Sequence, residues 1–153
     1  MNITHNKVYE FIIENLTFGD LSKEVLCEIF KDGRVASHLL ERQLVAWFPE
    51  LTHIPGCKSH DHTGADGALY DAKNFTKGGL KFMPSNQLGE GRVFVAEIAH
   101  EKAKKLIYIA CDIIDFPQVR VKFVDGAVLL KDYPSCKIPF GHRESFFAES
   151  QIG

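Results

Sequence analysis

Hydrophobic positions in the first third of the chain recur with the spacing of amphipathic helices. Residues 3–16 carry apolar side chains at mixed steps of three and four positions, at Ile3, Val8, Phe11, Ile12 and Leu16. This spacing predicts a helix with one buried face. A second helix is predicted to begin after an N-capping Asp20 and to end at Phe30, and a third to span residues 35–47 before Pro49.

From about residue 60 onward the pattern changes to that of strands. Residues 68–75 and 80–83 have the composition of strands, and LIYIACDII (106–114) is a nearly continuous apolar run typical of a buried strand. VRVKFV (119–124) alternates strictly, which indicates a half-buried strand. Residues 93–104 are expected to form a helix that crosses between strands. Helices followed by a mixed sheet predict an α/β (α+β) fold with a helical N-terminal part.

Length and composition fit a single globular domain of 153 residues, with 45% hydrophobic and 25% charged side chains. No apolar run approaches the roughly 20 residues of a membrane-spanning helix. The first residues lack the pattern of a secretory signal, and the four cysteines form no CxxC pair. We therefore expect a cytoplasmic protein with reduced thiols and no membrane partner.

The formal net charge of −2 does not favour a nucleic-acid-binding protein. Basic side chains are nevertheless frequent in one part of the sequence, at Lys73, Lys77, Lys81, Arg92, Lys102, Lys104 and Lys105. The simplest interpretation is a solvated surface, and the last three are expected on the outer face of the helix at 93–104. A basic groove could still bind DNA, because the local field matters more than the total charge.

Candidate chemistry is concentrated in SHDHTGADGALYDAKNFTKGG (59–79). Turn-forming residues near Asp66 separate two stretches that can extend, which predicts a hairpin. A turn centred there places Asp61 opposite Asp71, and strand alternation places Lys73 on the same side as Asp71. Two carboxylates held this close favour a bound Mg²⁺. The ammonium group can orient a water molecule and offset charge on a phosphate, so the trio predicts phosphodiester hydrolysis.

Each of these residues also has a plainer interpretation. Asp71 and Lys73 alone would fit an ordinary exposed strand. His60 and His62 flank Asp61 and suggest a rival metal site, but alternation places both on the opposite face. Asp66 is a rival carboxylate, and its position at the turn tip favours an Asx-turn.

The spacing Asp61-x9-Asp71-Ala72-Lys73 resembles the PD-(D/E)xK nuclease motif, and its surroundings are similar to PvuII-type restriction endonucleases. Pro55-Gly56 precedes the first aspartate, and Thr76-Lys77-Gly78 follows the triplet, at matching intervals. Ile29-Phe30-x-Asp32 also matches, so the resemblance covers roughly residues 29–80. The sequence departs from that type in having Asp71 in place of glutamate. It also lacks a poly-histidine stretch used there in base contacts.

The resemblance implies a restriction-endonuclease-like core, with a central mixed sheet flanked by helices, and a homodimer. It implies Mg²⁺-dependent hydrolysis of both DNA strands at a short palindrome, with Asp61 and Asp71 as metal ligands and one or two ions per site. It further implies that an acidic side chain on the upstream helix assists the site. Glu41 is the candidate, although it also fits an exposed helix face.

Side chains able to contact DNA follow the catalytic segment in KFMPSNQLGEGR (81–92). Amides can pair with adenine and arginine with guanine, although this segment also fits an ordinary turn. Asp32 and Arg34 suggest a further DNA contact or, equally, a helix cap. The predicted DNA-binding residues are Asp32, Arg34, Lys77, Lys81, Ser85, Asn86, Gln87 and Arg92.

The sequence therefore predicts one endonuclease domain over residues 1–153. Within it we expect a mainly helical part at 1–50 for dimerisation and DNA contacts, a catalytic core at 55–125 and a C-terminal tail at 126–153. The predicted activity is that of a type II site-specific deoxyribonuclease. A structure-selective or repair nuclease on the same fold, and a non-catalytic DNA-binding module, remain alternatives.

Overall fold

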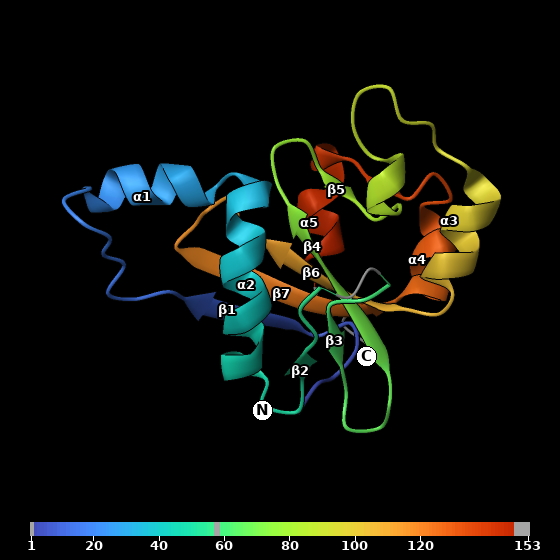
Figure 1. The fold of residues 1–153 in the computed structure, drawn as a ribbon, viewed down its shortest axis with the longest axis horizontal. Coiled ribbons are helices and arrows are strands. Elements are labelled where there is room, and N and C mark those ends of the chain that lie inside the picture. Colours follow the sequence, from blue (N-terminus) through green and yellow to red (C-terminus); the bar gives the residue numbers. More distant parts are fainter. Residues whose placement is uncertain (1, 57–58, 149–153) are drawn as a thin grey trace.

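The computed structural model describes residues 2–56 and 59–148, apart from the side chain of Ser85, and shows an α+β fold (Figure 1). Its elements in chain order are β1 (Val8–Ile12), α1 (Lys23–Phe30), α2 (Gly33–Trp47), β2 (Thr52–His53), β3 (His62–Thr63), β4 (Leu69–Phe75), β5 (Leu80–Lys81), the 3-10 turn η1 (Ser85–Gln87), α3 (Ala96–Ala103), β6 (Ile107–Asp112), β7 (Gln118–Asp125), α4 (Gly126–Asp132), β8 (Lys137–Ile138), the 3-10 turn η2 (Phe140–His142) and α5 (Arg143–Phe146). None of the helices in these ranges is long and apolar enough to span a bilayer.

The main sheet has six strands in the order β1-β7-β6-β4-β3-β2. β4 and β6 run parallel, and the other neighbouring pairs are antiparallel. A parallel pair needs a crossover connection, and here the crossover contains β5, η1 and α3. The mixed sheet and the crossover helix confirm the predicted fold class. β5 pairs instead with β8 in a separate two-stranded sheet.

The prediction of a helix over residues 3–16 is wrong, because this segment contributes the edge strand β1 to the main sheet. Phe11 of β1 stacks on Trp47 of α2 with ring centroids 4.1 Å apart. Asn6 and Asn15 have left-handed φ values of 67° and 55°, which interrupt a right-handed helix on both sides of the strand. The sequence VYEFI itself favours a strand once β7 provides a pairing partner.

The two later helices of the N-terminal part form as predicted, but their first residues differ from those predicted. Ser22 rather than Asp20 caps α1, because its hydroxyl accepts a hydrogen bond from the Val25 N–H at 3.2 Å. Asp32 caps α2 by accepting from the Arg34 N–H at 2.9 Å. Capping satisfies N–H groups that the first turn of a helix leaves without partners.

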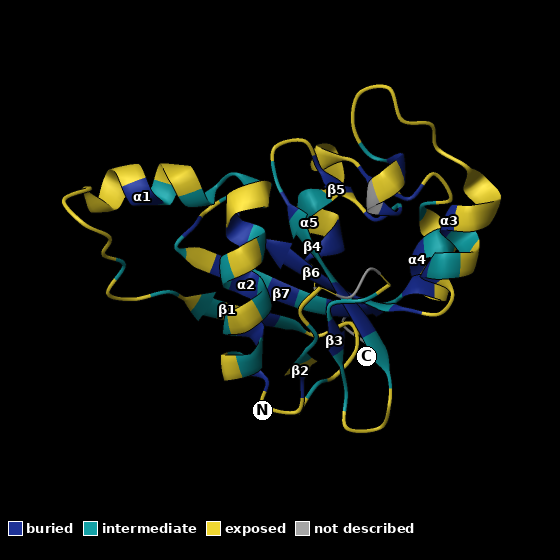
Figure 2. Cartoon of the chain, in the orientation of Figure 1, coloured by how far each residue is buried: buried dark blue, intermediate teal, exposed yellow. Residues whose placement is uncertain are grey.

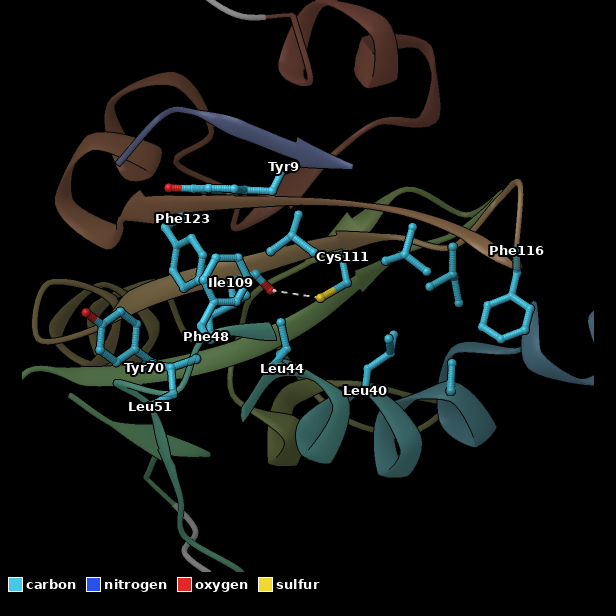
Figure 3. Close-up of a cluster of buried hydrophobic side chains, with 14 residues drawn as sticks. Tyr9, Leu40, Leu44, Phe48, Leu51, Tyr70, Ile109, Cys111, Phe116 and Phe123 are labelled. Atoms are coloured by element: carbon cyan, nitrogen blue, oxygen red, sulfur yellow. Dashed lines mark hydrogen bonds between the residues drawn. The ribbon is translucent and has the colours of Figure 1, made fainter. Parts of the chain in front are cut away.

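Hydrophobic side chains cover both faces of the sheet, and its central strands are the most buried elements (Figure 2). On one face α2 packs against β6 and β7, with Leu40, Leu44 and Phe48 of the helical segment in one cluster with Ile109, Cys111 and Phe123 of the strands (Figure 3). The alternate residues of β6 face the other way and pack with α3, α4 and α5. The sheet is therefore held between α2 and the C-terminal helices, and β4 lies between them.

The segment predicted as a C-terminal tail packs on the second face of the sheet. Phe146 and Phe147 are buried, and the Lys122 ammonium group of β7 donates a hydrogen bond to the Phe146 carbonyl at 2.5 Å. Asp112, which is 2% exposed, accepts hydrogen bonds from Arg120 of β7 and Arg143 of α5. Residues up to 148 therefore belong to the same domain as the sheet.

Candidate active site

The predicted hairpin at residues 62–75 forms, and its turn residues explain its register. Asp66 accepts a hydrogen bond from the Ala68 N–H at 3.0 Å, which is the Asx-turn expected for it, and Gly67 has a left-handed φ of 83°. His62 pairs with Tyr70 across the hairpin. Extending that antiparallel register by one residue places Asp61 opposite Asp71, as predicted.

Asp61 lies immediately before β3 and continues its contacts with β4. On the β4 side, β3 pairs with Leu69 and Tyr70, and the Asp61 N–H donates to the Tyr70 carbonyl at 2.9 Å. Two residues further along β4, the Ala72 N–H donates to the Oδ2 atom of Asp61 at 2.9 Å. This bond satisfies a backbone donor and fixes the carboxylate against β4.

Asp61 and Asp71 interact directly, and Lys73 lies beside them. Burial raises the pKa of Asp61 to about 7, and the neighbouring Asp71 carboxylate contributes further. Asp71 is 7% exposed, and its Oδ2 atom lies 3.3 Å from the Lys73 ammonium nitrogen. The three side chains predicted from the sequence therefore lie together. Two carboxylates carry more negative charge than the single lysine offsets.

This trio lies in a broad cavity of about 1340 Å³ between α2 and α3. These helices lie on opposite sides of β4 (Figure 1). β4 contributes residues 71–74, α2 contributes residues from its first three turns, and α3 and the segment after it contribute Ile98, Lys102 and Lys105. The remaining lining comes from the hairpin, the turn after β4 and η1, through Ser59, Asp61, Thr76, Gly78, Gly79, Lys81, Pro84, Asn86 and Leu88.

The donor set fits Mg²⁺ better than a metal held by many protein ligands. Among the residues described, no three or more His, Cys, Asp or Glu side chains form a metal-binding group. Mg²⁺ is commonly held by one or two carboxylates, and water and substrate phosphates complete its shell. Asp61 and Asp71 supply two such carboxylates. Burial raises the pKa of Asp61 most, the neighbouring Asp71 carboxylate raises it further, and a bound cation would favour the charged form of both.

Glu41 lies at the edge of the same cavity, as the resemblance implied. Its carboxylate contributes to the raised pKa of Asp61, which is consistent with a location near the two aspartates. Its Oε2 atom lies 3.2 Å from Nε2 of His53, and both side chains are largely buried. Glu41 is therefore held in place by a neighbouring strand and does not lie on an exposed helix face.

The two histidines that flank Asp61 have other partners. His62 is fully buried, and its Nε2 atom lies 2.6 Å from the backbone carbonyl of Glu41, so it donates there. His60 pairs with the Ser59 hydroxyl at 2.7 Å. This arrangement agrees with the expectation that the histidines do not join Asp61 in a rival metal site.

Four of the predicted DNA-binding residues line the cavity, namely Asp32, Arg34, Lys81 and Asn86. Asp32 also makes a bidentate ion pair with Arg34, at 3.3 and 3.1 Å, and caps α2. The helix-cap interpretation is therefore confirmed. The pair lies beside Gly33, where a Cβ atom would be 3.3 Å from the Thr76 methyl group, so the start of α2 packs closely on the end of β4.

Three other predicted DNA-binding residues, Lys77, Gln87 and Arg92, are not part of the cavity lining. Gln87 is buried, and its amide oxygen accepts from the Val95 N–H at 2.9 Å, so it fixes the loop that precedes α3. Lys77 is exposed at the tip of the turn after β4, and Arg92 is exposed in the loop before α3. The side chain of Ser85 lies outside the part of the chain that the structure describes.

Lys102 and Lys105 line the cavity, and Lys105 is exposed there, so part of the solvated face predicted for these lysines forms a wall of the cavity. Both are in the crossover that connects β4 to β6, so the topology brings them beside the strand that carries Asp71 and Lys73. The sequence contains a signal for this shared position, because residues 98, 102 and 105 are four and three positions apart. This spacing places them on one helix face. Lys104 falls on another face, where it lies 3.9 Å from Glu101.

Comparison with models of protein families, with curated proteins and with solved structures gave no match to this chain.

Proposed function

We propose that this chain is a Mg²⁺-dependent endonuclease that hydrolyses double-stranded DNA. One observation carries the proposal: the carboxylates of Asp61 and Asp71 meet beside the Lys73 ammonium group in a cavity that four further basic side chains also line, those of Arg34, Lys81, Lys102 and Lys105. Carboxylates alone would repel a phosphodiester. A divalent cation held by these carboxylates would instead attract the phosphodiester.

Each residue of the trio has a distinct task in this proposal. Asp61 and Asp71 would hold the metal, which supplies Lewis-acid stabilisation of the charge on the phosphate. The Ala72 N–H keeps the Asp61 carboxylate fixed, so little reorganisation is needed when a cation binds. The Lys73 ammonium group is 3.3 Å from Asp71 and can hold an attacking water molecule in line with the phosphorus atom.

The finer assignment is a type II restriction endonuclease with a restriction-endonuclease-like core. It rests on the resemblance to PvuII-type enzymes over residues 29–80. A twofold dimer would then present two identical sites to the two strands of a palindrome. Asn86 and Arg34 in the cavity lining are suitable for base contacts, because amides and guanidinium groups pair bidentately with purines.

Incubation of the purified protein with supercoiled plasmid tests the proposal. We expect cleavage with Mg²⁺ and none with chelator. Asp71→Ala and Lys73→Ala should each abolish cleavage, while the matched variant Lys131→Ala, in α4 and outside the cavity lining, should cut like the parent protein. Absence of cleavage by the parent protein across a Mg²⁺ titration would overturn the proposal and leave a DNA-binding module.

The products separate the two nuclease alternatives. Discrete fragments from a DNA of known sequence would support a site-specific enzyme, and their ends would give the recognition sequence and the overhang. A smear, or cleavage confined to branched or damaged substrates, would support a structure-selective or repair nuclease and overturn the finer assignment.

A further inference from the structure

The cavity face of α3 is defined by how the helix is anchored. Ala99 and Ala103 are fully buried against the core, so α3 has a fixed rotation about its axis. Ile98 and Lys102 then turn toward the cavity. Lys105 continues the same face, because the Lys105 N–H donates to the Lys102 carbonyl at 3.1 Å and extends the last turn.

The position of this face relative to the carboxylates is also fixed. Two residues after Lys105 the chain enters β6, where Tyr108 is in register with Asp71 of the parallel strand β4. The end of α3 packs tightly on the start of α4, because a Cβ atom at Gly126 would overlap the Ala103 carbonyl oxygen. Only a short segment of chain therefore separates Lys105 from β6, the strand that pairs with the strand carrying Asp71.

We propose that the α3 face formed by Lys102 and Lys105 binds the phosphate backbone of duplex DNA and holds it over the carboxylates. The inference rests on the proposed endonuclease function and names the element that positions the substrate. Its partner must be anionic, because the two lysines of this wall add positive charge to a cavity that Arg34 and Lys81 also line.

The size of the cavity favours a polymer over a small phosphate. Ligand pockets for small molecules usually measure about 300–1,000 Å³, and this cavity of about 1340 Å³ exceeds that range. A DNA backbone carries several phosphates in a row, so one can lie at the carboxylates while others reach the α3 lysines. Contacts of this kind fix the register of the duplex without reading its sequence.

Binding of a fluorescent duplex, measured with chelator over a range of salt concentrations, tests the inference. The two variants are Lys102→Ala/Lys105→Ala and the control Lys104→Ala, which removes a charge from another face of the same segment. Each lost phosphate contact reduces the slope of log K against log salt by about 0.9. We expect a decrease of about 1.8 for the double variant and an unchanged slope for the control.

Cleavage kinetics distinguish positioning from chemistry and from failure of the wider proposal. The double variant should raise KM and leave kcat within about twofold, and its far-UV spectrum and Tm should match those of the control. An unchanged salt slope, or a loss of kcat with normal KM, would overturn the α3 inference while the parent protein still cuts DNA. A parent protein that does not cut would instead refute the endonuclease function.

Discussion

The Oδ2 atom of Asp61 accepts a hydrogen bond from the backbone N–H of Ala72 at 2.9 Å. This bond connects the first acidic residue of the candidate site to the strand that carries the second acidic residue and the lysine. The relative position of the two carboxylates is therefore set by the backbone of one hairpin, before any metal or substrate binds. Several consequences can be measured directly.

Stability of the metal-free protein should fall as pH rises from about 4 to 7, in part because of Asp61. Its pKa is raised from 3.8 to about 7, so the folded chain binds a proton that the unfolded chain has released. The resulting stabilisation is complete below pH 4 and is lost as pH rises through 7. Asp61→Asn keeps an oxygen acceptor for Ala72 and should flatten this dependence.

Thermal unfolding with chelator measures this effect. At pH 8 the Asp61→Asn variant should have a Tm higher by on the order of 2–4 °C, the shift that about 1 kcal/mol produces in a domain of this size. Added Mg²⁺ should raise the Tm of the parent protein at pH 8 and have little effect on the variant. Equal Tm values for both proteins from pH 4 to 8 would contradict the electrostatic account of this carboxylate pair.

Removal of the Lys73 ammonium group should affect the chemical step and not the binding of DNA. The ammonium nitrogen of Lys73 is 3.3 Å from the Oδ2 atom of Asp71. We expect Lys73→Ala to reduce kcat by at least about 10²–10³-fold, the usual cost of losing a group that stabilises transition-state charge. Single-turnover cleavage at saturating DNA measures it. A tenfold increase in Kd with kcat unchanged would assign Lys73 to binding instead.

The carboxylate of Glu41 should support the metal site without being essential to it. It is held by His53 at 3.2 Å and adds to the negative charge around Asp61. Glu41→Gln should therefore lower the apparent Mg²⁺ affinity or the cleavage rate by about 10–100-fold, as changes next to metal ligands do.

A Mg²⁺ titration of the cleavage rate measures the effect of the Glu41 substitution. The matched control is Glu28→Gln, which removes an exposed carboxylate of α1 that pairs with Lys31 away from the cavity. Identical Mg²⁺ dependence of both variants would show that Glu41 has only a structural role.

Asp112 should be important for stability although it is remote from the candidate site. It is 2% exposed and is the shared partner of Arg120 and Arg143, at 2.8 and 3.0 Å. Asp112→Ala would leave two poorly exposed cations without that partner, and we expect a loss of about 3–5 kcal/mol in the free energy of unfolding in urea. Asp115→Ala removes a 65% exposed carboxylate from Arg143 and should cost less than about 1 kcal/mol.

The candidate site could be predicted because it is local in the sequence. Asp61, Asp71 and Lys73 belong to one hairpin, whose register follows from the turn at Asp66 and from strand alternation. The helix α2 and the strands β4, β6 and β7 were also predicted from local sequence patterns. No distant partner was needed to infer them.

Features that depend on distant partners could not be predicted in this way. The apolar spacing of residues 3–16 suits a helix or a strand, and pairing with β7, more than 100 positions away, decides for the strand. The orientation of α3 depends on Ala99 and Ala103 being buried against the second core, which places the lysines of that helix toward the cavity. Side-chain periodicity indicates which residues share a helix face, but not which face lies toward a site.

The two walls of the cavity come from α2 and from the crossover around α3, while the carboxylates come from the hairpin between them. With the proposed function, substitutions that accumulate in either wall would alter which duplexes are retained, and for how long, without disturbing the β4 backbone that carries Asp71. A lineage carrying this architecture could then diversify its targets while its acidic pair stays constant.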